Sequence, residues 1–261
     1  MSRIADFFGA IGEAVLATLQ GAGQIALFAL EALSHLVRPP FYPKLFLRQL
    51  AEVGFFSLPV VALTAVFTGM VLALQSYSGF QRFSAESAVA TVVVLSITRE
   101  LAPVLAGLMV AGRVGASMAA EIGTMRVTDQ IDALTTLSTN PMKYLVAPRL
   151  LAGTVALPLL VVVADILGVA GGFVVGVWKL GFNAGSYMHN TWQYLEFIDV
   201  FSGLVKAAVF GFVVALMGCF HGYRSRGGAQ GVGAATTAAV VSASILILAF
   251  NYVVTEAFFA R

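Results

Sequence analysis

Five long apolar runs limit what this chain can fold into. Each has about 20 residues or more, the length of a helix that crosses a hydrocarbon core of roughly 30 Å. Composition agrees, because charged residues make up 11% of the 261 residues, whereas an ordinary soluble domain carries about 25%. The sequence therefore predicts an all-α polytopic membrane protein. The five spans are expected near 53–76, 88–113, 147–178, 203–222 and 234–258.

The first 45 residues have a different pattern, in which apolar side chains recur at helical period. We expect them to form amphipathic helices in the membrane interface, with a second amphipathic piece that ends near Val37. A degenerate first span across residues 14–37 is the alternative. A cleaved signal peptide is not expected, because Asp6, Glu13 and Glu31 interrupt the apolar residues and no clear cleavage site follows. The apolar stripe consists of Ile4, Phe7, Phe8, Ile11, Val15 and Leu19.

The lysines and arginines predict an orientation, since cytoplasmic loops of membrane proteins carry an excess of these residues. With a cytoplasmic N-terminus, ten of the 15 basic residues lie on that side and the other five lie opposite or in the membrane. We therefore expect the loop between spans two and three to be cytoplasmic and the C-terminus, after five spans, to be periplasmic. In this division, residues 1–45 form interfacial helices and residues 46–261 form the transmembrane domain.

The loop between spans two and three, residues 119–148, alternates charged and apolar side chains. Thr128 is the expected N-cap of a short helix that carries Ile131 and Leu134 on one face. The Asn-Pro pair at 140–141 predicts a break after this helix. Such a helix either lies on the membrane surface or inserts into a groove of a soluble partner, and the pattern alone favours neither.

Two adjacent charges, Arg99 and Glu100, stand inside the second predicted span. A charge near the bilayer centre costs about 2.5–3.5 kcal/mol on insertion scales, so the two are not expected to face lipid together. Lys206 enters the fourth span and could pair with Glu100. Two interpretations remain open: a structural ion pair that fixes helix register, or a polar patch in a lipid cavity.

Several other functions find no support in the sequence. The single cysteine, Cys219, allows no intrachain disulfide, and His35, His189 and His221 are too far apart for a metal-ligand motif, so no metal site is expected. The chain has no GxxxxGK[ST] loop for a nucleotide, and the glycine-rich segment 227–233 is better explained as a flexible turn. A net charge of +2 gives no reason to expect a nucleic-acid partner.

Two functions of other classes are possible for a polytopic membrane protein, and the sequence supports neither. An intramembrane lipid-modifying enzyme needs a nucleophile–base pair or paired carboxylates, but Glu100 is the only glutamate in the spans before Glu256. An ion-coupled secondary transporter usually has inverted repeats and broken helices, and no internal repeat is visible here. Transport that depends on ATP and is unaffected by ion gradients would exclude the second function.

Several motifs resemble the MlaE family of permeases, the membrane subunits of Mce-associated lipid transporters, and they occur in the same order. The longest is RELAPVLAGLMVAGRVGASMAAEIGTMRVTDQIDAL, and the runs FTGMVLALQSY, NPMKYLVAPRLLAG and ATTAAVV are similar as well. The resemblance extends from about Phe46 to the C-terminus and implies an ABC transporter permease without a nucleotide site of its own. The segment 224–233 departs from the family's pattern, so no contact is carried over for it.

The resemblance also implies roles for particular residues. A helix in the Glu121–Leu134 region would dock on a cytoplasmic ATPase subunit, which binds the ATP. A homodimer would enclose an outward-facing pocket for phospholipid. The residues implied for ATPase coupling are Glu121, Met125, Arg126, Asp129, Ile131 and Leu134. The residues implied for the lipid pocket are Leu72, Phe80, Phe83, Arg99, Glu100 and Lys206.

The expected partners follow from the same resemblance. They are a second copy of the chain, the ATPase subunit, a periplasmic Mce-domain protein and, bound to the ATPase, a small STAS-domain protein. The implied location is the inner membrane of a Gram-negative cell, and the implied role is the maintenance of outer-membrane lipid asymmetry.

Overall fold

The computed structural model describes residues 2–39 and 42–260, and every element in these two ranges is helical. Six stretches are long and apolar enough to cross a membrane, which confirms the prediction of an all-α polytopic membrane protein. The segments are α1 Ser2–Val37, α2 Pro43–Gly54, η1 Phe55–Ser57, α3 Leu58–Phe80, η2 Gln81–Phe83, η3 Glu86–Ala88, α4 Val89–Ser96, η4 Ile97–Leu101, α5 Ala102–Val110, η5 Ala111–Gly115, α6 Ala116–Val127, α7 Gln130–Thr136, η6 Met142–Val146, α8 Ala147–Trp178, α9 Ala184–Gln193, α10 Phe197–Tyr223 and α11 Gly228–Phe259.

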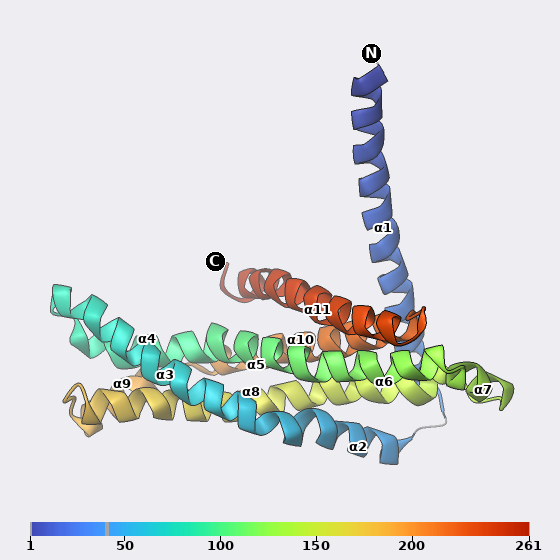
Figure 1. Ribbon diagram of the computed structural model, residues 1–261. Coiled ribbons are helices and arrows are strands. Elements are labelled where there is room, and N and C mark those ends of the chain that lie inside the picture. Colours follow the sequence, from blue (N-terminus) through green and yellow to red (C-terminus); the bar gives the residue numbers. More distant parts are fainter. Residues whose placement is uncertain (1, 40–41, 261) are drawn as a thin grey trace.

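The long helices lie side by side in a bundle with two distinct ends (Figure 1). One end carries α7, the end of α1, the start of α2 and the turn from α10 to α11, and we call it the α7 end. The opposite end carries α9 and the connection from α3 to α4, and we call it the α9 end. All loops that the charge pattern assigns to the cytoplasm therefore gather at the α7 end.

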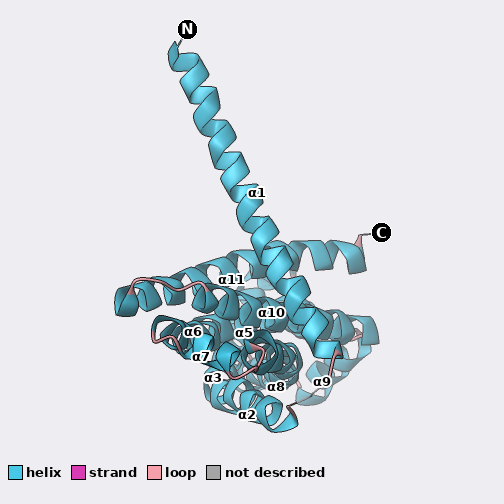
Figure 2. Cartoon of the chain, turned by 90° about the vertical axis from the view of Figure 1, so that its right-hand side faces the viewer, coloured by secondary structure: helices cyan, strands magenta, loops and turns pink. Residues whose placement is uncertain are grey.

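The helix α1 does not join this bundle along its length. It leaves the α7 end crosswise to the other helices, as Figures 1 and 2 show from two directions. Its stretch Val15–Leu36 is apolar enough for a span, yet the crosswise direction is the one expected of a helix in the membrane interface. One expectation was wrong: α1 is a single continuous helix, without a division into two amphipathic pieces. The side chains of residues 2–11, which include the first four of the predicted stripe, lie outside the described part of the structure.

The spans extend beyond the apolar runs that predicted them. Continuous helical stretches cover Pro43–Phe80, Glu86–Val127 and Met142–Trp178, whereas the sequence placed the first span from residue 53 and ended the second at 113. Hydropathy marks only the part of a helix that contacts lipid or the core, so polar extensions at the α7 end escaped the pattern. The bounds of α8 agree with the predicted 147–178.

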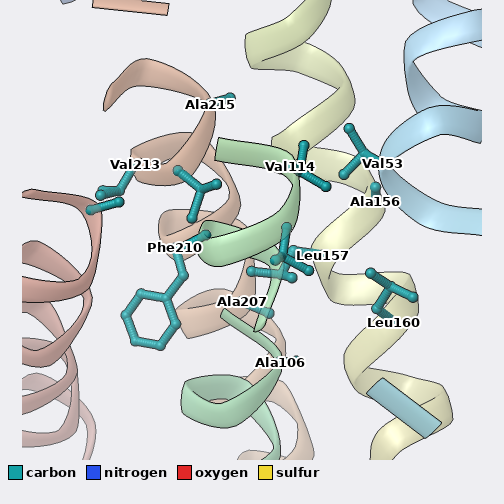
Figure 3. Close-up of a cluster of buried hydrophobic side chains, with 14 of the residues drawn as sticks. Val53, Ala106, Val114, Ala156, Leu157, Leu160, Ala207, Phe210, Val213 and Ala215 are labelled. Carbon is teal, nitrogen blue, oxygen red and sulfur yellow. The ribbon is translucent and has the colours of Figure 1, made fainter. Parts of the chain in front are cut away.

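Glycines allow the helices to approach closely around a core centred on α10. A Cβ atom on Gly69 of α3 would lie 1.8 Å from the carbonyl oxygen of Gly168 on α8. A Cβ atom on Gly211 of α10 would lie 2.1 Å from the carbonyl oxygen of Gly153 on α8. Such small-residue contacts are the usual way in which helices pack tightly in lipid. Figure 3 shows apolar side chains such as Leu157 and Ala106 between α8, α5 and α10, while the ring of Phe210 points away from α8.

Candidate functional site

The candidate site begins with an irregular turn in the second span. Residues Ile97–Leu101 form a π-helical segment, η4, directly before Pro103. Proline has no N–H group, so Pro103 cannot donate the usual helical hydrogen bond to the carbonyl of Arg99, four residues earlier. The ammonium group of Lys206 on α10 takes that place, because Nζ donates to the Arg99 carbonyl oxygen at 2.7 Å. A π-helical segment is often found at a functional site.

Glu100 is held by three side chains from two other helices. Its Oε1 accepts from Lys206 Nζ at 2.7 Å and from the Thr255 hydroxyl at 3.0 Å, and its Oε2 accepts from the Asn251 amide at 2.9 Å. The side chain of Lys206 is 0% exposed, so the ammonium is fully enclosed by these acceptors. The pairing of Lys206 with Glu100 that the sequence suggested is confirmed.

Arg99 points to a different partner at the same level of the bundle. Its Nε donates to Asp199 Oδ1 at 2.7 Å, and its guanidinium lies 4.5 Å from the ring centroid of Phe259. Asp199 is fully buried, and its other oxygen accepts from the backbone N–H of Glu196 in the capping box that starts α10. We call Arg99, Glu100, Asp199, Lys206, Asn251 and Thr255 the polar network.

Close backbone contact holds the network together. A Cβ atom on Gly203 of α10 would lie 2.3 Å from the carbonyl oxygen of Thr98, within η4. Only glycine at this position lets α10 approach near enough for Lys206, one turn further on, to reach both Glu100 and the Arg99 carbonyl.

The structure brings together only part of the predicted lipid pocket. Arg99, Glu100 and Lys206 meet between η4, α10 and α11. Leu72 and Phe80 lie on α3, half-buried against the core, on a helix that packs chiefly on α8 and α4. The side chain of Phe83 lies outside the described part of the structure. The pocket role of these residues therefore stays a prediction.

The sequence missed three members of the polar network. Asp199 was assigned to the loop before the fourth span, although its spacing from Glu196 is that of a helix N-terminus. Asn251 and Thr255 lie four residues apart on α11 and so share one helix face. A polar stripe within the last apolar run was the signal that could have identified them.

At the α7 end, two of the predicted coupling residues form ion pairs with residues outside that predicted set. Glu121 pairs with the buried Arg149 of α8 at 2.8 Å, and Arg126 pairs with Asp132 at 2.7 Å across the α6–α7 corner. Ile131 is buried and therefore anchors α7 on the bundle.

Other parts of the α7 corner differ in detail from the predicted helix. The expectation that Thr128 caps this helix was wrong: Asp129 occupies the N-cap position in a left-handed conformation, and the Thr128 hydroxyl donates back to Thr124. Met125 and Leu134 are half-buried, whereas Asp129 remains exposed. The break at residues 140–141 is present, and the Asn140 side chain accepts from the backbone N–H of Met142.

A multi-pass helical bundle with charges paired inside it is typical of membrane transport proteins. Comparison with known proteins then identifies the family. The family model described as Permease MlaE matches residues 46–257, and the chain belongs to this family. It is accordingly an ABC transporter permease, a membrane subunit rather than a catalytic one.

Individual relatives agree with this assignment. The chain is 60% identical over 249 residues to a probable ABC transporter permease protein of Rickettsia bellii, which covers 95% of this chain and 96% of the relative. It is 34% identical over 262 residues to the intermembrane phospholipid transport system permease protein MlaE of Haemophilus influenzae, which covers 98% of each chain. A probable ABC transporter permease protein of Synechocystis is 42% identical over 79% of this chain and 78% of its own length.

Proposed function

We propose that this chain is the permease subunit of an ATP-driven transporter that moves phospholipid between the inner and outer membranes and so maintains outer-membrane lipid asymmetry. The proposal rests on one structural observation, the polar network at the α9 end. Charges inside a span are expensive and usually mark a transport path. The name of the Haemophilus relative supports phospholipid as the substrate.

Some side chains of the polar network contact only the protein, and others are exposed enough to contact a lipid. Lys206 and Asp199 are fully buried and hold the helices together, whereas about a third of the Arg99 and Glu100 side chains is exposed. The guanidinium of Arg99 can therefore meet a phosphate while it remains paired with Asp199. Leu72, Phe80 and Phe83 of α3 and η2 would supply apolar walls for the acyl chains.

A second copy of the chain would complete the pocket. The faces of α3 and α11 that point away from the bundle are apolar and exposed in one chain, and they are the surfaces available to lipid or to another copy. On α3 the exposed residues include Val60, Leu63, Phe67 and Val71, and on α11 they include Val241, Ile245, Leu248 and Tyr252.

The α7 corner would bind the cytoplasmic ATPase subunit. Its inward side, with Ile131, packs on the bundle, and its outward side presents Asp129, Asp132 and Leu137, the last of which is 74% exposed. The Glu121–Arg149 and Arg126–Asp132 pairs would transmit a push on α7 to α8 and α6. This arrangement requires a cytoplasmic N-terminus and a periplasmic C-terminus, in agreement with the excess of basic residues at the α7 end.

The remaining partners belong to the two sides of the membrane. A periplasmic Mce-domain protein at the α9 end would exchange lipid with the pocket, and a STAS-domain protein would bind the ATPase. ATP binding and hydrolysis would shift the dimer between states with the pocket open and collapsed.

Reconstitution tests this function. The complex purified through the tagged chain is placed in proteoliposomes with fluorescent phospholipid, and transfer to acceptor vesicles is followed with ATP, without ATP and with imposed ion gradients. We expect transfer that requires ATP, ignores ion gradients and is lost in the Glu100→Gln/Lys206→Met variant. A chain that purifies without a nucleotide-binding subunit, or transfer driven by an ion gradient, would overturn the proposal.

A further inference from the structure

A second polar position in the bundle, Asp165 of α8, is separate from the polar network. Asp165 of α8 is 8% exposed, and its Oδ1 has no hydrogen-bond partner among the described residues. A buried carboxyl oxygen without a hydrogen bond is expensive, so native proteins seldom leave one. Its presence indicates that something outside the described chain donates to it.

Asp165 lines a cavity of about 430 Å³ at the α9 end. Pockets for small ligands usually measure about 300–1,000 Å³ and are mostly apolar with a few polar groups. This cavity has that character, and it is bounded by α4, η4, α8, α9 and the start of α10. Its lining includes Val94, Val162, Ile166, Val169, Phe173, Met188, Trp192, Leu195 and Val200.

The polar groups in the wall can accept hydrogen bonds but have few hydrogens to offer. The hydroxyl groups of Thr98 and Thr191 donate to carbonyls of their own helices, at 2.9 Å in each case. They therefore present only oxygen lone pairs to the cavity, as does the free oxygen of Asp165. The indole N–H of Trp192, at the exposed rim, is the remaining donor among the lining residues. A ligand that fits must bring its own donors.

The position of the cavity indicates where such a ligand comes from. Val200, the fourth residue of α10, lines the same cavity as Asp165, so the carboxyl group lies near the level at which α10 begins. Ile166 and Trp192 are both more than half exposed on the outside of the bundle, which leaves the cavity open toward lipid. An amphiphile can enter sideways from the bilayer with its polar group toward the α9 end.

We propose that this cavity is a lipid-binding site that selects amphiphiles with a hydrogen-bond donor in the headgroup, either an amine or a hydroxyl. The donor binds the Asp165 carboxyl group, and the apolar lining receives part of an acyl chain. The site lies on the flank of α8 toward α9, whereas the polar network lies between η4, α10 and α11. It does not depend on the proposed transport function.

Tryptophan fluorescence can report on the site directly, because the chain has only two tryptophans. In a Trp178→Phe background, Trp192 at the cavity rim is the sole reporter. The full chain is reconstituted in phosphatidylcholine vesicles, and quenching of Trp192 is measured as brominated phosphatidylethanolamine, phosphatidylglycerol or phosphatidylcholine is added. Phosphatidylethanolamine carries an ammonium donor and phosphatidylglycerol hydroxyl donors, whereas the phosphatidylcholine headgroup carries none.

We expect the association constant of phosphatidylethanolamine to exceed that of phosphatidylcholine about tenfold, as one hydrogen bond to a carboxylate of about 1.4 kcal/mol implies. If phosphatidylglycerol is preferred over phosphatidylcholine to the same extent, any hydrogen-bond donor in the headgroup is sufficient. If only phosphatidylethanolamine is preferred, the site requires the ammonium group. In Asp165→Val the preference should fall to near one. The matched control Thr154→Val removes a hydroxyl of α8 outside the cavity and should keep the preference.

Three results would overturn the proposal. The first is equal quenching by all three brominated lipids in the parent chain. The second is a preference that survives in Asp165→Val. The third is a Trp192 that no brominated lipid reaches in the intact complex, which would assign the cavity to a helix of a partner protein.

Discussion

The ion pairs of the polar network and the Arg126–Asp132 pair lie at opposite ends of the bundle and differ in burial. At the α9 end, Lys206 and Asp199 are fully buried, and each is paired within the polar network. At the α7 end, the side chains of Arg126 and Asp132 are 34% and 61% exposed, although their ion pair has the same 2.7 Å length. These ion pairs therefore have the same length, but water reaches the Arg126–Asp132 pair far more than it reaches Lys206 and Asp199.

Burial decides how much each kind of ion pair stabilises the bundle. An exposed ion pair contributes about 0–1 kcal/mol because water already solvates both charges. A buried pair is costly to break, since removal of one partner leaves an uncompensated charge in an apolar setting. The polar network thus fixes helices around a polar patch at the α9 end. At the α7 end the buried Arg149 is also paired, with Glu121, whereas the Arg126–Asp132 pair stays accessible to a partner. Four variants test this contrast.

Lys206→Met should cause the largest loss of stability. It leaves Glu100 without its cation and the Arg99 carbonyl without a donor, and we expect the free energy of unfolding to fall by about 3 kcal/mol. Unfolding in mixed detergent micelles, followed by tryptophan fluorescence against SDS fraction, measures the change. The control is Glu100→Gln/Lys206→Met, which removes both charges and should recover a large part of the loss. A double variant that is less stable than Lys206→Met would contradict the pairing.

Gly203→Ala should destabilise the same end through packing. The added Cβ would lie 2.3 Å from the Thr98 carbonyl oxygen and so forces α10 away from η4. Overpacking of this kind costs about 1–3 kcal/mol. The matched control is Gly233→Ala on α11, where a Cβ atom meets no atom within 4 Å. The control should be neutral or stabilised by up to about 1 kcal/mol, because alanine favours a helix over glycine. Similar melting curves for the two variants would refute the close contact.

Asp165→Val should have the opposite sign to the two variants above. Removal of a buried oxygen that lacks a hydrogen bond is expected to raise the free energy of unfolding by about 1–2 kcal/mol in detergent. The measurement is the same SDS titration, in a detergent that has no hydrogen-bond donor. A loss of stability comparable to that of Lys206→Met would mean that Asp165 has a partner within the chain.

Asp132→Ala should have the smallest effect on stability. The pair with Arg126 is exposed, so the free energy of unfolding should change by no more than about 0.5 kcal/mol. Binding of the ATPase subunit, measured by co-purification, should decrease because α7 loses a fixed charge on its outward side. A change in the free energy of unfolding above about 1 kcal/mol would mean that the Arg126–Asp132 pair stabilises the protein as a buried pair does.

The sequence predicted the helices well, because membrane spans follow from hydropathy and length. It predicted α8 within its observed bounds, and it placed the loops of each side at a common end. It did not predict that α1 is one continuous helix, since its apolar pattern is equally compatible with one helix or two. Helix extensions such as residues 114–127 were missed because their polar residues resemble a loop.

Of the site residues, the sequence predicted only those whose charges stand out within apolar spans. Arg99, Glu100 and Lys206 are conspicuous in apolar runs, and the pairing of two of them followed from their scarcity. Asp199 lies 100 residues from Arg99 in the sequence, so no local pattern connects them. The role of Pro103 in freeing the Arg99 carbonyl for Lys206 requires knowledge of which helices meet. Ile131 was predicted on an apolar helix face, but which side of that helix faces the bundle depends on packing.

The central claim is that the α9 end binds lipid and the α7 end binds the ATPase, and parallel purification of two variants tests it most directly. Each variant is extracted from its native membrane in mild detergent, and co-purifying proteins and phospholipids are quantified by mass spectrometry. We predict that Leu137→Asp loses the ATPase subunit and retains phospholipid. Glu100→Gln/Lys206→Met should retain the ATPase subunit and carry less phospholipid per chain, because only the lipid of the Asp165 cavity remains. Loss of both partners in either variant, or of neither in both, would contradict this division between the two ends.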